Sequence, residues 1–85
     1  MIVEIIIRST SNKEWDIELK VDQYDEISRI DSVEINYPDG KRSYYSRKLK
    51  SLKVKSENRL IDLLNNSFSE EIELAILNKK RLYEF

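Results

Sequence analysis

The side chains best suited to recognise a partner gather in one short basic segment. Between residues 41 and 55 the chain has seven lysines and arginines, no acidic residue, and the adjacent pair Tyr44 and Tyr45. Closely spaced cations bind carboxylates or phosphates, and a tyrosine ring offers a flat apolar surface to a protein side chain or to an unpaired base. The candidate partner-binding residues are Lys41, Arg42, Tyr44, Arg47, Lys48, Lys50, Lys53 and Lys55.

Three interpretations of this basic segment stay open. If the segment is an extended strand, Arg42, Tyr44 and Lys48 share one face, because successive side chains of a strand alternate. That face can dock on a larger acidic protein, or it can bind nucleic acid with its cations on phosphates and Tyr44 stacked on a base. The simplest interpretation is a solvated strand whose lysines prevent edge-to-edge aggregation. Of the two partners, the acidic protein is favoured.

Acidic side chains dominate the preceding part of the chain. Residues 1–40 hold ten acidic and four basic side chains, although the whole chain has a net charge of only −1. Asp16 and Glu18 alternate with apolar residues, so we expect them on a solvated strand face, where they can imitate a phosphate backbone or attract the basic segment. Asp22, Asp25 and Glu26 lie close together, but their order lacks the central Gly of an EF-hand loop. We therefore predict no metal site.

The composition argues against catalysis. The chain has no Cys and no His, which removes the thiolate nucleophile, the usual general base near neutral pH and the commonest metal ligand. It contains a single Gly, and its sequence shows no phosphate-cradling glycine loop and no nucleophile elbow. We expect a protein that is not an enzyme and that uses no cofactor.

The first part of the chain has the pattern of β-strands. Apolar residues recur at every second position in residues 3–7 and 15–21, which predicts an antiparallel hairpin, and again in residues 33–37. Pro38-Asp39-Gly40 then forms a turn, followed by a strand over residues 41–47. Leu49, Leu52 and Val54 either continue this strand or form a fifth one. Residues 22–30 fit a loop or a helical turn equally well.

The C-terminal third has the pattern of two helices. Ser56 is the predicted N-cap of the first. Its apolar stripe is Leu60, Ile61, Leu63, Leu64 and Phe68. The second helix has acids in its first turn and cations in its last, which suits the helix dipole. Its main apolar arc is Ile72, Ala75, Ile76, Leu82 and Tyr83. The prediction is one α+β domain over residues 1–85: a four- or five-stranded antiparallel β-meander (1–55) with two C-terminal helices (56–85) packed on one face.

Four apolar residues lie outside the predicted core of this domain. Leu74 and Leu77 project away from the main apolar arc of the second helix, and Ile2 and Ile6 occupy the second face of the first strand. A two-layer domain buries only one face of each element. These four residues are therefore the candidate oligomer interface, and a homo-oligomer is slightly favoured.

These observations favour a small non-enzymatic protein-interaction module that docks on a larger protein through its basic, Tyr-bearing strand. In composition and size the chain resembles small inhibitor or adaptor proteins of low-GC bacteria and their phages, although no family motif is present. Nucleic-acid binding through the same segment is one alternative. Sequestration of phosphate or a nucleotide by Arg42 and Arg47 in an oligomer is another. The apolar run at residues 2–7 is too short for a membrane span and lacks the basic start of a signal peptide, so we expect a cytoplasmic protein.

Overall fold

Alternating apolar residues build a four-stranded antiparallel sheet, and two helices follow it. The computed structural model describes residues 1–82. The elements are β1 (Ile2–Arg8), β2 (Glu14–Val21), β3 (Ile27–Asn36), β4 (Arg42–Ser46), α1 (Val54–Ser67) and α2 (Ser69–Leu82). The strands neighbour one another in chain order, β1-β2-β3-β4. The sheet is therefore a meander, and the predicted α+β fold is confirmed with four strands.

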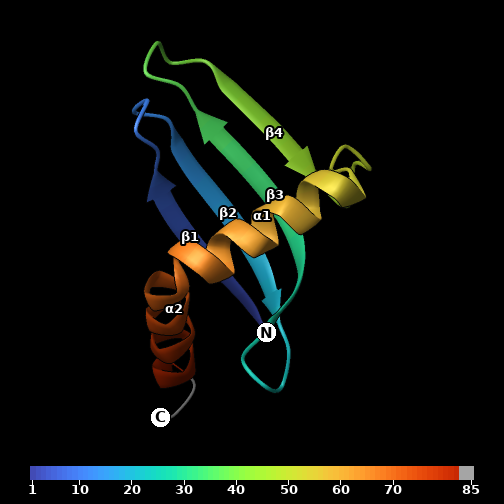
Figure 1. Cartoon of the computed structure of the whole chain (residues 1–85), viewed down its shortest axis with the longest axis vertical. Helices are drawn as coiled ribbons and strands as arrows, with labels where there is room; N and C mark the ends of the chain where they lie inside the picture. The colour runs from blue at the N-terminus through green and yellow to red at the C-terminus, as the bar shows by residue number, and fades with distance from the viewer. Residues whose placement is uncertain (83–85) are drawn as a thin grey trace.

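One face of the sheet carries the core. The register places Ile17 between Ile5 and Val33, and all three side chains are buried. Figure 1 shows α1 crossing this face diagonally, while α2 runs beside β1. The helices complete the core with Leu64, Ile72 and Ile76. Burial of these apolar side chains is the main favourable contribution to folding.

The alternate side chains form the second face of the sheet, which we call the open face. One row across it consists of Ile6, Asp16, Glu34 and Tyr44. In the described part of the chain the buried apolar residues of both helices, Leu64, Ile72 and Ile76, pack in the core on the other face. Most of the open face is therefore solvated, as predicted for Asp16 and its neighbour Glu18, although Ser32 and Ser46 are buried there.

Turn chemistry sets the ends of the strands. Gly40 has a φ of 90°, which favours glycine, and its N–H donates to the carbonyl of Tyr37 at 3.0 Å, so the predicted turn is present. Of residues 22–30, which were predicted to be a loop or a helical turn, only 22–26 form a loop, whereas 27–30 belong to β3. In the loop the Asp22 carboxylate accepts hydrogen bonds from the N–H groups of Tyr24 and Glu26, at 2.8 and 3.1 Å.

A buried carboxylate fixes α1 to the sheet. The pairing of β2 with β3 shifts between Glu18 and Leu19, so that Asp31 is passed over in the register. Next to this bulge the N–H of Ile30 donates to the Glu57 carboxylate at 2.9 Å, and Arg47 donates to the same oxygen. One side chain of the first helical turn thus fixes the start of α1 against β3 and the end of β4.

The structure corrects the prediction for the basic segment. The strand ends at Ser46, because residues 47–50 form a turn in which the Lys50 N–H donates to the Arg47 carbonyl and Lys50 has a positive φ of 55°. Within residues 1–82 there is no fifth strand. The first helix begins at Val54, with Lys53 rather than Ser56 as its N-cap.

The predicted apolar stripes are largely buried, with two exceptions. Leu63 of α1 and Leu82 of α2 are exposed, at 48% and 71%. Leu82 is in the last turn of its helix, beyond the part of α2 that packs on the sheet through Ile72 and Ile76. Tyr83, which was assigned to the same arc, lies outside the described residues. Leu63 lies at the margin of the helix stripe, where it borders a groove.

Candidate functional site

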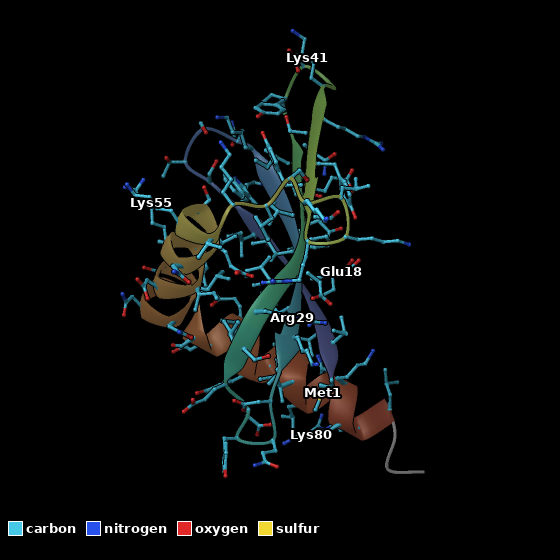
Figure 2. The ribbon with its side chains drawn as sticks, turned by 90° about the vertical axis from the view of Figure 1, so that its right-hand side faces the viewer. Met1, Glu18, Arg29, Lys41, Lys55 and Lys80 are labelled. Carbon is cyan, nitrogen blue, oxygen red and sulfur yellow. The ribbon has the colours of Figure 1, made fainter. Side chains whose placement is uncertain are left out.

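The structure distributes the predicted partner-binding residues over four places. Arg42 and Tyr44 lie on the open face of β4, opposite Asn36 and Glu34 of β3. Lys41 is at the tip of the β3–β4 hairpin, Arg47, Lys48 and Lys50 are in the turn after β4, and Lys53 and Lys55 are at the start of α1. Figure 2 shows how far Lys41 and Lys55 lie from each other. The eight residues therefore do not form one continuous strand face.

Three of these cations are already paired with carboxylates. The Arg47 guanidinium pairs with the Glu57 carboxylate. The Arg42 Nη1 lies 3.8 Å from the Glu34 Oε1, and the Lys41 Nζ lies 3.9 Å from the Asp39 Oδ2. The last two pairs are exposed and therefore contribute little to stability. In each of the three ion pairs the carboxylate partly neutralises the cation, so the cation attracts an anionic partner less strongly.

The remaining cations lie in the turn after β4 and at the start of α1. Lys48, Lys50, Lys53, Lys55 and also Arg59 have no ion-pair partner among residues 1–82. Lys53 is the N-cap of α1 and makes no side-chain capping hydrogen bond. Cations near a helix N-terminus oppose the helix dipole, and Lys is a poor N-cap. The start of α1 is thus locally unfavourable for the fold and attractive to an anion.

Beside this cationic region an apolar groove lies between α1 and the sheet. It encloses about 470 Å³. Its apolar lining consists of Trp15, Val33 and Ile35 from the sheet, Tyr45 of β4, Leu52, and Leu60 and Leu63 of α1. The groove exists because α1 crosses the sheet diagonally, so that the hairpin ends of the strands extend beyond the helix (Figure 1).

The polar residues of the groove all belong to its α1 side. They are Ser51, Lys53, Ser56 and Arg59. No acidic residue lines the groove within the described part of the chain. We call these four residues the rim of the groove. The rim carries hydroxyl groups and positive charge, and the rest of the lining is apolar. The groove is therefore complementary to a ligand that has both large apolar side chains and carboxylates.

The open face has the opposite electrostatic character. Glu4 lies opposite Glu18, and Asp16 lies opposite Glu34, so like charges face each other across strands. Burial raises the pKa of Asp16, and the hydrogen bond and negative charge of Glu4 raise it further. Tyr44 shares its row with Asp16 and Glu34, so carboxylates lie on one side of its ring and the cations Arg47 and Lys48 on the other.

A smaller hollow of about 390 Å³ lies on the open face. It contains Tyr44, Arg47 and Lys48 of the predicted set, but Glu18 and Asp31 line it as well. Two of its cations are already bound, since Arg29 pairs with Asp31 at 2.8 Å and Arg47 pairs with Glu57. Its mixed charge gives it no clear preference for an anion.

The predicted oligomer residues are all exposed but do not lie on one element. Ile2 and Ile6 are on the open face of β1, at 36% and 57% exposure, and Leu74 and Leu77 are on the outer side of α2, at 59% and 46%. Their exposure agrees with the prediction that they exceed the needs of the core. Oligomerisation itself stays a prediction.

Most residues of the groove could not be assigned to a site from the sequence. Trp15 and Leu60 have the pattern of core residues and do pack against the core, but they also line the groove. Tyr45 was placed on the strand face opposite Tyr44, and Arg59 was predicted for no site. The diagonal path of α1, which separates groove from core, has no signature in a periodicity pattern. Lys53 at the N-terminus of α1 could have indicated the cationic rim. This signal is visible only if α1 is known to begin at Val54 rather than after Ser56.

Neither helix of the described residues is long and apolar enough to cross a membrane. No metal-holding group of three or more acidic, His or Cys side chains occurs among them either. Comparison of the chain with protein-family models, with curated proteins and with solved structures finds no match.

Proposed function

We propose that this protein is a non-enzymatic interaction module that holds an acidic, apolar segment of a larger protein in the groove between α1 and the sheet. The observation that carries the proposal is the combination of an apolar groove with a rim whose only charged side chains, Lys53 and Arg59, are unpaired cations within residues 1–82. The preference for an acidic protein partner is thus kept, but the docking surface moves from the open face to the groove.

The apolar lining supplies the anchoring contacts. Trp15 and Tyr45 are aromatic, and aromatic side chains are enriched among residues that dominate binding energy. Tyr45 and Leu63 are 41% and 48% exposed, so a partner side chain placed between them removes apolar surface from water on both molecules. The volume of the groove suits two or three large apolar side chains, within the range of about 300–1,000 Å³ typical of ligand sites.

The cationic rim supplies orientation and selectivity. Arg59 lies one helical turn after Lys55 on α1, and Lys53 is at the N-terminus of the helix, where the free backbone N–H groups also favour an anion. A carboxylate of the partner can therefore meet Lys53 while its apolar neighbour enters the groove. A partner segment with lysines in these places is repelled.

Nucleic acid is less well matched by the same surfaces. Tyr44, the tyrosine predicted to stack on a base, is flanked on the open face by Glu34 and lies near Asp16 and Glu18. Carboxylates at that spacing repel phosphates. Tyr45 instead lines the groove together with Trp15 and Leu60, and this apolar lining fits a protein side chain better than a charged backbone.

The experiment that tests this proposal is selection from a random library of displayed peptides of about 12 residues, long enough for three helical turns. We expect the selected peptides to combine Phe, Trp or Leu with at least two Asp or Glu. The double variant Lys53→Glu/Arg59→Glu should bind them at least about tenfold more weakly, because both rim charges are reversed. The matched control is Arg42→Ala/Tyr44→Ala, which alters the open face and should bind them as the wild type does.

Two outcomes would overturn the proposal. Selected peptides that carry no acidic residues, or that bind the rim variant unchanged, would remove the cationic groove as the site. Loss of binding in Arg42→Ala/Tyr44→Ala alone would assign docking to the open face. Single-stranded DNA is titrated in parallel at physiological salt and followed by anisotropy, and we expect no binding. If the wild type binds the DNA and Lys53→Glu/Arg59→Glu does not, the rim binds nucleic acid rather than protein.

A further inference from the structure

The outer side of α2 carries an apolar stripe that the core does not use. Ile72 and Ile76 are buried, whereas Leu74 and Leu77 are 59% and 46% exposed. At 100° per residue Leu74 points about 160° away from both buried isoleucines, and Leu77 points about 140° away from Ile72 and about 100° away from Ile76. We propose that a second copy of this chain covers them, with the two α2 helices packed antiparallel about a twofold axis.

The sequence of the stripe is complementary to itself in that orientation. Glu70, Leu74, Leu77 and Arg81 recur at intervals of four, three and four residues and therefore share one face of α2. When an identical helix is placed antiparallel with Leu74 opposite Leu77 of the second copy, Glu70 falls opposite Arg81 of the second copy. The twofold axis repeats both contacts, so two leucine pairs are closed at each end by an ion pair.

The charged residues of the stripe are available for this contact. Among residues 1–82, neither Glu70 nor Arg81 has an ion-pair partner. Lys80, by contrast, is held by Asp25 at 2.8 Å and fastens the last turn of α2 to the β2–β3 loop (Figure 2). Lys80 and the buried Ile72 and Ile76 thus fix the helix to its own domain, while the stripe itself makes no ion pair within residues 1–82.

Antiparallel packing is also favoured by the charge distribution along α2. Its first turn contains Glu70 and Glu71, and its last turn contains Lys79, Lys80 and Arg81. Antiparallel helices bring the acidic start of one beside the basic end of the other, and their dipoles attract. A parallel pair places Glu70 beside its own copy and is disfavoured by both effects.

This interface is separate from the groove. The groove lies between α1 and strands β2 to β4, whereas α2 packs beside β1, at the opposite edge of the sheet. A twofold dimer through α2 therefore presents two outward grooves, and the resulting module is bivalent. A partner with two acidic segments would gain affinity from such an arrangement.

Sedimentation velocity of the full chain over a concentration series tests the dimer. The contact area of two 14-residue helices is small, so we expect reversible association with a dissociation constant between about 10 µM and 0.5 mM. Leu74→Asp/Leu77→Asp should be monomeric throughout. The single variants Glu70→Arg and Arg81→Glu should each associate about tenfold more weakly, because each places like charges opposite one another.

The combined variant Glu70→Arg/Arg81→Glu discriminates most sharply, since it restores opposite charges in the same register. We expect its dimer affinity to return towards that of the wild type. Failure of this rescue, or a wild type that stays monomeric at about 1 mM, would overturn the proposal.

Ile6→Asp on the open face is the control for the other exposed apolar residues, Ile2 and Ile6. Loss of the dimer in Ile6→Asp, with retention in Leu74→Asp/Leu77→Asp, would assign the interface to the sheet instead.

Discussion

The Glu57 carboxylate accepts a hydrogen bond from the backbone N–H of Ile30 at 2.9 Å, which connects the first turn of α1 to the bulge of β3. Glu57 is 8% exposed and Ile30 is fully buried. A buried N–H group without a partner is costly, so this contact determines where α1 sits on the sheet. The place and the width of the groove follow from it, because α1 forms one wall.

Removal of this carboxylate should destabilise the fold. Glu57→Ala leaves the Ile30 N–H and the Arg47 guanidinium without their acceptor, and we expect a loss of about 2–3 kcal/mol in the free energy of unfolding. The expected loss is below that of a fully buried pair because Arg47 is 45% exposed. Urea unfolding measures it. Glu71→Ala, an exposed acid in the first turn of α2, is the control and should change stability by less than about 0.5 kcal/mol.

The N-cap of α1 should show opposite effects on stability and on binding. Lys53→Ser supplies a hydroxyl that can cap the helix and removes a cation from its N-terminus, so we expect a gain of about 0.5–1 kcal/mol in the free energy of unfolding. The same substitution should weaken the binding of acidic peptides. Thermal unfolding and peptide titration measure the two effects. A variant that is less stable, or that binds more tightly, would contradict this role of Lys53.

Two adjacent leucines of α1 should separate folding from binding. Leu64 is fully buried, whereas Leu63 is 48% exposed and lines the groove. Leu64→Ala should cost about 2–5 kcal/mol because it leaves a cavity in the core. Leu63→Ser should cost less than about 1 kcal/mol yet weaken peptide binding about tenfold. Equal effects of the two substitutions on stability would contradict the placement of α1.

The acidic row of the open face should make stability depend on pH. The pKa of Asp16 is raised in the folded state by burial and by Glu4, so the folded protein holds this proton more tightly than the unfolded chain does. Ionisation therefore costs stability as the pH rises above the ordinary carboxyl range. Asp16→Asn should be more stable than the wild type at pH 7, and the difference should vanish below about pH 4, where both states are protonated.

Urea unfolding of Asp16→Asn and the wild type at several pH values checks this prediction. Glu18→Gln, on the same strand of the open face, is the matched control. A gain in stability for Asp16→Asn that grows as the pH falls would have the wrong sign and would contradict it.

Periodicity was sufficient to predict the sheet and the helices. Residues 15–21 alternate strictly, and Ile17, Leu19 and Val21 are all buried. The basic segment was predicted less well, because residues 41–49 contain no Gly or Pro to mark a turn, yet the chain turns after Ser46. That turn depends on tertiary contacts: the Ser46 N–H donates to the Ser51 hydroxyl, and the Arg47 N–H donates to the Asp31 carbonyl.

The groove could not be predicted either, because it also depends on tertiary structure. Trp15 and Leu63 satisfy the same patterns as core residues, and only the diagonal crossing of α1 leaves them at the edge of the core. That crossing depends on Glu57, which the sequence presents as an ordinary acid in a first helical turn. The contact between Glu57 and Ile30 joins residues far apart in the chain, and no local pattern encodes it.

The emission of Trp15 provides the most direct test of the proposed function. Trp15 is the only tryptophan of the chain and lines the groove, so its emission reports on whether the groove is filled. Titration with a selected acidic peptide without Trp should shift the emission in a saturable way in the wild type and in Arg42→Ala/Tyr44→Ala, but not in Lys53→Glu/Arg59→Glu. If anisotropy of the labelled peptide shows binding while the emission of Trp15 stays unchanged, the peptide binds elsewhere and the groove is not the docking site.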